Sequence, residues 1–340
     1  MAGIPEAAKD IQLKNIYLGI SESCNAACPF CYREFYSPKP GGFMSDEVFR
    51  SILTQIRQIE TIESVSLTVA EPTLHPRFDE FSIELNKNRR YKTTIVTNMS
   101  LAHKHLESLM LYDGIVMSVE GFDRESYENS RRGLKWERVK ENIIMLDEYI
   151  KKHDNKGPKR KINFIVDRSS KIKEFVAFWS RYADVILIDP MLPQTVWKNG
   201  SSELKDTSDH LFPFTASKEI VCMEPFYRLG IMSDGSVRPC GTRMYERKYY
   251  GDYRNLLEAF HTNGNILLLR KQREKNGFRG CGNCRHSLEV DRQEWEELIR
   301  EHQDVSHENV VFAKGLMEVN GGIWQGKKTG AGGAAGATRK

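Results

Sequence analysis

Six short apolar runs alternate with longer amphipathic stretches in the first two thirds of the chain, and this alternation restricts the possible folds more than any other feature. The runs are rich in branched residues, which favours strands that are covered on both faces. Strand-then-helix units in succession predict a parallel sheet with right-handed crossovers, and six units are fewer than the eight of a closed barrel. The predicted fold class is therefore α/β, a partial (β/α)6 barrel. The predicted strands are Ile16–Ile20, Ser64–Val69, Thr93–Thr97, Gly114–Val119, Lys161–Val166 and Val185–Ile188.

The stretches between these runs carry helix signals. Ser45 is a natural N-cap, and the two acidic residues behind it suit the N-terminus of a helix. Further helices are predicted near Phe78–Lys87, His103–Leu111, Trp136–Lys151 and Lys171–Tyr182. In such sheets the active site lies at the carboxyl ends of the strands. Side chains that directly follow the six runs are therefore the candidates for function.

From about Pro190 the alternation stops. Asp234-Gly235 between two short apolar runs predicts a β-hairpin, and Asp291–Gln303 predicts a helix. The Gly- and Ala-rich end of the chain cannot bury enough apolar surface to order itself. The predicted division is an N-terminal extension (1–13), the barrel (14–190), a loop-rich linker (191–215), a small second domain (216–290), a helical segment (291–325) and a disordered tail (326–340).

The overall charge is small. A formal net charge of +4 over 340 residues gives no support for nucleic acid or an acidic membrane as the main partner. We find no apolar run long enough to span a bilayer and no signal peptide. We therefore expect a cytoplasmic protein without nucleic-acid or membrane partners.

Seven cysteines fall into two groups. Cys24, Cys28 and Cys31 lie close together just after the first predicted strand, and the other four lie in the last third of the chain. Free cysteines are often only small buried apolar residues, but close spacing of this kind is typical of metal ligands. Three thiolates can bind three irons of a cubane and leave the fourth iron open for a small ligand.

The Cys-x3-Cys-x2-Cys spacing of the first group, on a loop after the first strand, resembles the radical S-adenosylmethionine (SAM) superfamily. The resemblance implies a [4Fe-4S] cluster with three cysteine ligands, whose open iron is chelated by the amino and carboxylate groups of SAM. It also implies that the reduced cluster delivers one electron, which cleaves a C–S bond and gives a 5′-deoxyadenosyl radical. Phe30 matches the family's aromatic residue that lies against the adenine.

The resemblance continues at the ends of the second and third strands. Val69-Ala70-Glu71-Pro72 stands where the family usually has Gly-Gly-Glu-Pro, which implies that Glu71 faces the ammonium group of SAM. Thr97-Asn98-Met99 matches the family's Thr-Asn-Gly, except that Met99 replaces the glycine. The resemblance therefore adds Asn98 to the SAM-binding residues.

Two further fragments follow the fourth strand. Ser118 and Glu120 stand in a sequence similar to the family's Ser-x-Asp-Gly, whose hydroxyl and carboxylate contact the ribose. Arg132, before Gly133, stands in the following Arg-Gly, whose arginine can pair with the SAM carboxylate. The resemblance thus implies a SAM site that is shared between successive strand ends.

The second cysteine group supplies four thiolates, from Cys222, Cys240, Cys281 and Cys284. Four cysteines at a hairpin and a Cys-x2-Cys pair could bind zinc. Behind a radical SAM barrel they resemble the Twitch domain, the shortened relative of the SPASM domain. This resemblance implies a second [4Fe-4S] cluster that is fully bound by cysteine, with a role in electron transfer or structural support.

The same four-cysteine spacing resembles 2-deoxy-scyllo-inosamine dehydrogenase and related enzymes of aminoglycoside biosynthesis. It implies abstraction of hydrogen from a hydroxyl-bearing carbon of a sugar or aminocyclitol, loss of the hydroxyl proton, and transfer of one electron to the auxiliary cluster, so that a ketone forms. Glu120, Arg168 and Asp189 are strand-end candidates for the base. A flavodoxin or ferredoxin is the expected electron donor.

Three alternatives remain open. An epimerase of an aminoglycoside sugar or of a peptide residue would need a hydrogen donor, usually a cysteine outside the clusters, and the two cysteine groups leave none over, although a tyrosine could substitute. A maturase of a ribosomal peptide would often carry a leader-binding module, for which the residues before Cys24 are too few unless that module is a separate chain. An electron carrier or zinc-binding scaffold would have no need of the SAM-site residues.

Overall fold

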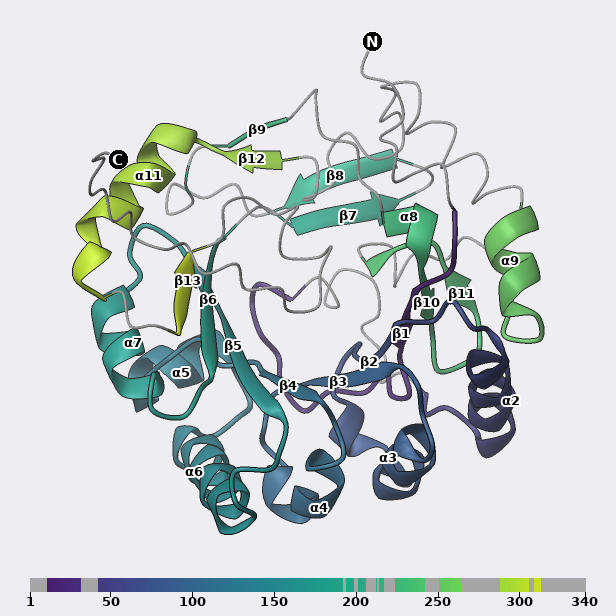
Figure 1. The fold of residues 1–340 in the computed structure, drawn as a ribbon. Helices are drawn as coiled ribbons and strands as arrows, with labels where there is room; N and C mark the ends of the chain where they lie inside the picture. The colour runs from purple at the N-terminus through teal and green to yellow at the C-terminus, as the bar shows by residue number, and fades with distance from the viewer. Residues whose placement is uncertain are drawn as a thin grey trace, which may run out of the picture.

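A curved sheet of nine strands, in the order β11-β10-β1-β2-β3-β4-β5-β6-β13, forms the centre of the molecule (Figure 1). It is seen in a computed structural model that describes residues 11–31, 42–191, 194–198, 201–205, 212, 214–216, 224–241, 251–263, 288–305 and 309–312. Six consecutive parallel strands confirm the predicted α/β fold with a parallel sheet. These strands are β1 (Asn15–Leu18), β2 (Ser64–Leu67), β3 (Lys92–Thr97), β4 (Gly114–Met117), β5 (Lys159–Val166) and β6 (Val185–Pro190).

Helices cover the outer, convex side of this sheet (Figure 1). Ser45 caps the first of them as predicted, because its hydroxyl accepts a hydrogen bond from the backbone N–H of Val48. The sequence signals predicted five of these helices and missed the short α5, which follows the fourth strand. The helices are α2 (Asp46–Gln58), α3 (Phe78–Asn86), α4 (Leu106–Leu109), α5 (Arg124–Ser130), α6 (Trp136–Lys152) and α7 (Ile172–Trp179).

The predicted helix over 103–111 is in fact two short pieces. A 3-10 turn (Ala102–Lys104) precedes α4, and His105 separates the two with non-helical dihedral angles. The ring of His105 and the hydroxyl of Ser108 both contact the carboxylate of Asp79 on α3, at 2.8 and 2.6 Å. These contacts attach the broken helix to its neighbour.

The main hydrophobic core lies between the sheet and the helices. On β5, Ile162, Phe164 and Val166 belong to this core, and the ring of Phe164 stacks on Phe175 of α7 with centroids 3.6 Å apart. Because successive side chains of a strand point to opposite faces, Lys161 and Asn163 face the inside of the barrel. The inner surface therefore carries polar groups at positions between apolar ones.

Later segments extend both edges of the barrel sheet. The predicted Asp-Gly hairpin is present as β10 (Arg228–Ile231) and β11 (Val237–Arg238), and β10 pairs in parallel with β1. At the other edge, β13 (Val310–Phe312) pairs in parallel with β6. Neither pairing was predicted, and both bring parts of the later sequence beside the first and last barrel strands.

Residues 191–215, predicted to be a loop-rich linker, contain regular structure. β7 (Gln194–Lys198) and β8 (Ser201–Lys205) form an antiparallel pair, and in the sequence an Asn-Gly at 199–200, outside the described residues, stands between them. Asn-Gly is a frequent hairpin turn, so this pairing could have been predicted from the sequence. A further pair joins β9 (Phe214–Ala216) to β12 (Leu288–Val290).

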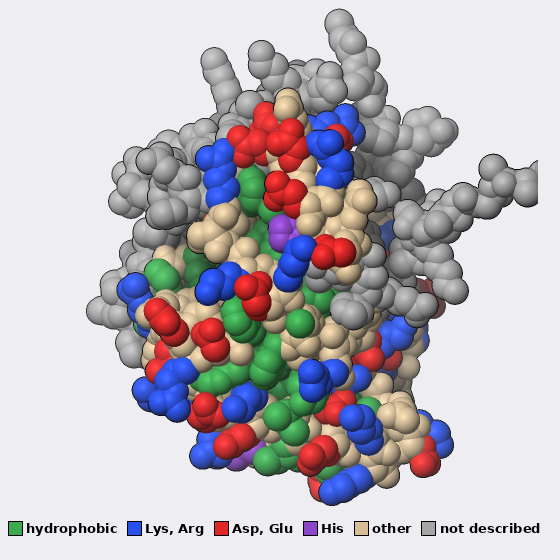
Figure 2. Space-filling model, turned by 90° about the vertical axis from the view of Figure 1, so that its left-hand side faces the viewer, with side chains coloured by type: hydrophobic (Ala, Val, Ile, Leu, Met, Phe, Trp, Pro, Cys, Tyr) green, Lys and Arg blue, Asp and Glu red, His purple; other side chains and the backbone are tan. Residues whose placement is uncertain are grey.

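Helices α8 (Glu224–Tyr227), α9 (Leu256–Thr262) and α11 (Arg292–Glu301) complete the described elements, together with short 3-10 turns. The predicted helix at 291–303 is thus confirmed as α11, which Asp291 caps. On the face in Figure 2, Lys and Arg side chains alternate with Asp and Glu side chains and form no large patch of one sign. Within the described ranges, no helix is both long and apolar enough to cross a membrane.

Candidate functional site

Cys24, Cys28 and Cys31 lie on the loop that leaves the carboxyl end of β1, as the sequence predicted. All three are free thiols; Cys28 is buried, with 4% of its surface exposed, and the other two are half-buried. Burial raises the pKa of Cys28 to about 11, although the nearby Arg131 guanidinium lowers it. This loop therefore presents three thiols at the edge of the sheet where the site was expected.

The loop is fixed by backbone hydrogen bonds from two neighbouring segments. The N–H of Glu71, just after β2, donates to the carbonyl of Ser23 at 3.0 Å. The carbonyl of Arg132 accepts from the N–H of Ala27 at 2.7 Å. Gly133 has φ +89°, and a Cβ there would lie 3.0 Å from the carbonyl oxygen of Asn25. The turn after α5 thus packs directly against the cysteine loop.

Glu71 connects the end of β2 to the end of β3. Its carboxylate is 1% exposed and accepts hydrogen bonds from the backbone and hydroxyl of Thr73, the hydroxyl of Thr97 and the backbone N–H of Asn98, at 2.6 to 3.2 Å. Burial raises the pKa of Glu71, and these hydrogen bonds lower it in part. In this structure the carboxylate therefore braces two strand ends, and its contact with a SAM ammonium group stays a prediction.

Three residues of the site have left-handed backbone conformations that usually favour glycine. Their φ angles are +76° for Val69, +48° for Ala70 and +62° for Met99. All three stand at places where the resembling family has glycine. The chain thus keeps a glycine-like backbone with side chains that carry Cβ atoms, and each such residue costs about 1–2 kcal/mol.

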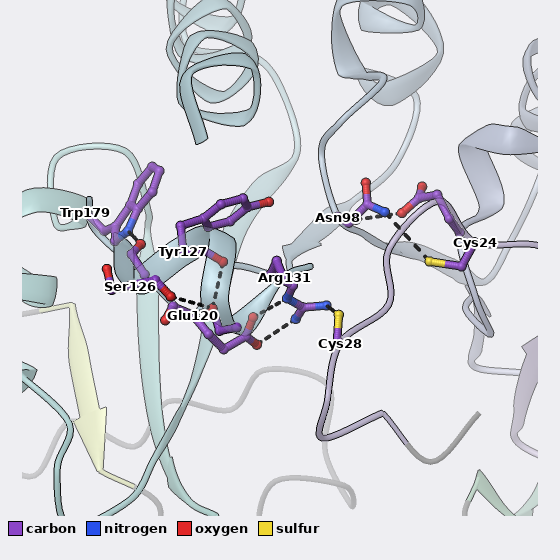
Figure 3. A network of polar contacts seen from close by, with 11 residues as sticks. Cys24, Cys28, Asn98, Glu120, Ser126, Tyr127, Arg131 and Trp179 are labelled. Carbon is purple, nitrogen blue, oxygen red and sulfur yellow. Dashed lines mark hydrogen bonds and ion pairs between the residues drawn. The ribbon is translucent and has the colours of Figure 1, made fainter. Parts of the chain in front are cut away.

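Asn98 joins the end of β3 to the cysteine loop (Figure 3). Its side-chain nitrogen lies 2.9 Å from the side-chain oxygen of Asn25 and 3.9 Å from the sulfur of Cys24. The side-chain nitrogen of Asn25 in turn donates to the hydroxyl of Ser100 at 2.9 Å. The structure therefore brings Asn98 beside the first cysteine, and its role toward SAM stays a prediction.

Arg131 lies between Glu120 and Cys28 (Figure 3). Its Nε and Nη2 donate to the two carboxylate oxygens of Glu120, the second at 2.6 Å, and its Nη1 lies 3.5 Å from the sulfur of Cys28. Burial lowers the pKa of Arg131, but the adjacent Glu120 carboxylate raises it by more. The guanidinium centre also lies 5.3 Å from the centre of the Phe30 ring. Arg131 therefore places a positive charge directly beside the sulfur of Cys28.

The sequence pointed instead to Arg132, and the structure places that side chain differently. Arg132 is exposed, and its backbone rather than its guanidinium holds the cysteine loop. Arg131 directly follows the last turn of α5, which the sequence analysis missed, and the place before Gly133 was the signal that favoured Arg132. Ser118 is half-buried at the end of β4, with its backbone N–H bonded to the carbonyl of Thr97 at 2.9 Å. The roles of Ser118 and Arg132 toward SAM stay predictions.

The three candidate bases lie in different surroundings. Both carboxylate oxygens of Glu120 are bound by Arg131, and exposed Arg168 forms an ion pair with Glu294 of α11 at 2.6 Å. Asp189 is buried on β6. The sequence analysis did not single out Lys161. Burial lowers the pKa of Lys161, and the charge of Asp189 raises it by less, so that the pKa of Lys161 is lowered overall. The structure thus places Asp189, but not Arg168, in a buried polar setting.

Of the second cysteine group, the described residues include Cys240. Cys240 is a buried free thiol after β11, whereas Cys222, Cys281 and Cys284 lie outside the described residues. Over the described part of the chain, no group of three or more His, Cys, Asp or Glu side chains is arranged to hold a single metal ion. The second cluster therefore stays a prediction.

A buried cluster of charged and aromatic side chains lies beside Cys240. Glu224 and Arg228 form an ion pair, and the Arg228 guanidinium stacks 4.2 Å from the ring centre of Tyr17 on β1. The backbone N–H of Gly241 lies 3.5 Å from a Glu224 carboxylate oxygen. Burial raises the pKa of Tyr17 to about 12. The first barrel strand is thus in direct contact with the segment around Cys240.

Comparisons with known proteins agree with this fold. Residues 18–157 match the profile of the radical SAM superfamily. A protein of Pyrococcus furiosus, described as a tungsten-containing aldehyde ferredoxin oxidoreductase cofactor-modifying protein, is 30% identical over 90 residues, which is 26% of this chain and 25% of that protein. This chain thus matches about a quarter of the length of that curated relative. The segment 18–157 is a radical SAM domain, and it contains the cysteine loop and the strand ends described above.

Two solved structures show a similar fold. SuiB of Streptococcus suis, bound to the precursor peptide SuiA, gives a TM-score of 0.58 with 17% identity, over 76% of this chain and 67% of that one. BtrN in complex with AdoMet and 2-DOIA gives a TM-score of 0.53 with 15% identity, over 81% of this chain and 93% of that one. At these identities the likeness concerns the fold alone.

A radical SAM domain implies SAM and a [4Fe-4S] cluster, and the residues present fit both. Three free thiols share one loop, and a guanidinium lies against the most buried of them. The hydroxyl of Tyr127 is buried beside these groups and has no hydrogen-bond partner among the described residues. A buried polar group without a partner is uncommon, so a bound cofactor would complete this site.

Proposed function

We propose that this radical SAM protein oxidises a hydroxyl-bearing carbon of a sugar or aminocyclitol to a ketone. The observation that carries the proposal is the polar inner face of the barrel at β5 and β6, formed by Lys161, Asn163 and Asp189. These strands end at the same sheet edge as the cysteine loop, where ligands of parallel sheets bind. A small polyol could therefore lie beside the SAM-binding residues.

The three side chains offer complementary hydrogen-bonding groups. The ammonium of Lys161 is a donor, and the carboxylate of Asp189 is an acceptor. The side-chain oxygen of Asn163 is buried and has no hydrogen-bond partner among the described residues. A hydroxyl or amino group of a cyclitol can satisfy the Asn163 oxygen, whereas an apolar substrate would leave it unpaired at a cost of about 1–3 kcal/mol.

The residues of this chain divide the chemical work. Cys24, Cys28 and Cys31 would hold the first cluster, and Cys222, Cys240, Cys281 and Cys284 a second one. When bound, SAM and the reduced first cluster supply a one-electron oxidant that removes hydrogen from carbon, and a second cluster would take up the remaining electron. The task left to the protein is to orient the alcohol and to accept its hydroxyl proton.

Asp189 is the best placed of the three candidate bases. Glu120 already has both oxygens bound to Arg131, and Arg168 is exposed and paired with Glu294. Asp189 is buried on the inner face of β6, and its charge acts on the pKa of Lys161. A carboxylate in this position can take the proton of a bound hydroxyl group.

Dehydrogenation leaves a ketone and needs no new hydrogen at carbon. The seven cysteines are all assigned to the two clusters, so no thiol is left as a hydrogen donor for epimerisation. The similarity of fold to BtrN, solved with 2-DOIA, favours a small ligand. The similarity to SuiB, bound to a precursor peptide, instead favours a peptide substrate, which is the second candidate.

The decisive experiment is anaerobic reconstitution followed by turnover. Two clusters predict about eight irons per chain, and about four after replacement of Cys24, Cys28 and Cys31 by alanine. With aminocyclitol substrates we expect one 5′-deoxyadenosine per ketone and no deuterium from D2O in the product. Deuterium in a product of unchanged oxidation state would establish an epimerase, and turnover of peptides alone would establish the second candidate.

A further inference from the structure

We infer that Arg131, oriented by Glu120, is a positioning residue for the Cys28 ligand and raises the reduction potential of the SAM-binding cluster. The inference concerns the cluster of the radical SAM domain and is independent of the substrate. It differs from the role expected for an arginine at this place, which is to pair with the SAM carboxylate. The contacts that carry it are those of one buried guanidinium.

The hydrogen bonds of Arg131 are divided between an acid and a sulfur. Nε and Nη2 face the two oxygens of Glu120, and Nη1 is left to face the Cys28 sulfur at 3.5 Å. The two charged side chains are only 13% and 6% exposed. A planar guanidinium held by two parallel hydrogen bonds has its third edge fixed in direction. Glu120 therefore decides where Nη1 points.

The backbone around this pair is equally constrained. A Cβ on Gly121 would lie 2.4 Å from the backbone nitrogen of Tyr127, so the end of β4 packs tightly against α5. The indole N–H of Trp179 donates to the carbonyl of Gly121 at 2.8 Å, and Asp123 caps α5 in a capping box with Ser126. Since Arg131 directly follows α5, its distance from Cys28 is set by this packing.

The glutamate itself is a departure from the resembling family, which has aspartate at this place. A glutamate side chain is one methylene longer, and here it spans the gap to Arg131 with both oxygens. This is why the carboxylate pairs with the arginine rather than being left for a ribose. The substitution therefore changes what the acid does at the site.

The chemistry follows from charge. Reduction adds one electron to a cluster, and hydrogen bonds to its sulfur ligands and nearby positive charge stabilise the reduced form. The site is buried, so solvent screens these charges weakly. Arg131 contacts the sulfur directly, and Glu120 lies on the far side of the guanidinium. The arginine therefore favours reduction, and the glutamate offsets part of this effect.

The test is a potentiometric titration of the reconstituted full-length protein without substrate, followed by EPR. The SAM-binding cluster is identified as the one whose signal changes when SAM is added. We expect Arg131→Gln to raise the ratio of oxidised to reduced cluster at least tenfold at a given applied potential. This equals a decrease of about 59 mV in the reduction potential for one electron. We expect Glu120→Gln, which keeps the shape but removes the charge, to shift it in the opposite direction.

Arg124→Gln is the matched control. Arg124 lies at the start of α5, is exposed, and pairs only at 3.6 Å with Glu137, so its replacement should leave the potential unchanged. A merely structural role for the Arg131–Glu120 pair predicts lower iron content in both variants and no shifts of opposite sign. Unchanged potentials with full iron content would overturn the inference.

A second measurement applies if Arg131→Gln does not retain its iron. Arg131→Lys keeps the charge but loses the fork that binds Glu120, so we expect iron retention with a potential between the parent and the predicted value for Arg131→Gln. Glu120→Gln then decides the sign: a raised potential supports the inference, and a lowered or unchanged one refutes it. None of these results depends on whether the substrate is a polyol or a peptide.

Discussion

Replacing Ala70 by glycine should stabilise the protein, although glycine usually weakens a fold. Ala70 has φ +48°, directly after Val69 at φ +76°, on the segment that joins β2 to Glu71. A left-handed conformation costs an L-residue about 1–2 kcal/mol, and glycine adopts it freely. The substitution therefore removes strain that the present sequence carries.

Two losses reduce this gain. Glycine gives the unfolded chain more freedom, worth about 0.4–1 kcal/mol, and the half-buried methyl group contributes at most a few tenths of a kcal/mol beyond that. The net expectation for Ala70→Gly is an increase of about 0.5 kcal/mol in the free energy of unfolding. The assay is urea denaturation of the apoprotein under anaerobic conditions, read as a shift in midpoint at unchanged slope.

Two matched variants make the measurement decisive. Ala102→Gly replaces a buried alanine without a left-handed backbone and should destabilise by about 1 kcal/mol. Met99→Gly relieves a similar strain at φ +62° but removes a fully buried side chain, so a net loss of about 2 kcal/mol or more is expected. If Ala70→Gly destabilised as much as Ala102→Gly, the strain at Ala70 would not exist and the reasoning would be wrong.

Three further predictions follow from buried groups. His75 is buried, donates from Nε2 to the carbonyl of Met44 and accepts at Nδ1 from the N–H of Arg77, and burial lowers its pKa. Because the unfolded chain takes up the proton more readily, the free energy of unfolding should fall as the pH drops below about 6.5. Urea midpoints measured from pH 8 to pH 5 should therefore depend less on pH for His75→Gln than for the parent protein. Gly121→Ala should cost at least about 3 kcal/mol, measured by urea denaturation, because the new Cβ would meet the backbone of α5. Tyr127→Phe should stabilise the apoprotein by about 1 kcal/mol, because it removes a buried hydroxyl that has no partner among the described residues. This gain should disappear after reconstitution with the cluster and SAM. Equal gains in both states would contradict a role of the hydroxyl toward a cofactor.

The barrel could be predicted from the sequence because its strands and helices carry strong periodic signals. Lys161–Val166 was predicted as a strand and lies within β5 (Lys159–Val166), and Trp136–Lys151 differs from α6 by one residue. Ser45 was predicted as a cap and acts as one. The cysteine loop was placed at the correct sheet edge because parallel strands bring their carboxyl ends together.

Pairings between distant segments could not be predicted in the same way. β13 is only three residues long, and its pairing with β6 depends on contacts such as those of Asn309 with the carbonyls of Ser180 and Ala183. The choice of Arg131 over Arg132 depends on where α5 ends, and a shift of one residue turns a helical side chain by a large angle. Lys161 and Asn163, which we propose to face the substrate, were not singled out because a strand pattern does not mark which polar residues contact a ligand.

The departures from the family pattern act on two different properties of the site. At Val69, Ala70 and Met99 the backbone keeps the left-handed form, and the buried carboxylate of Glu71 holds the two strand ends in place, so these changes affect stability more than geometry. Glu120 is different, because its longer side chain pairs with Arg131 and fixes a positive charge at the sulfur of Cys28. A glycine restored at the strained positions should therefore leave the reduction potential of the first cluster unchanged, whereas aspartate restored at position 120 should shift it, because the shorter side chain releases the guanidinium.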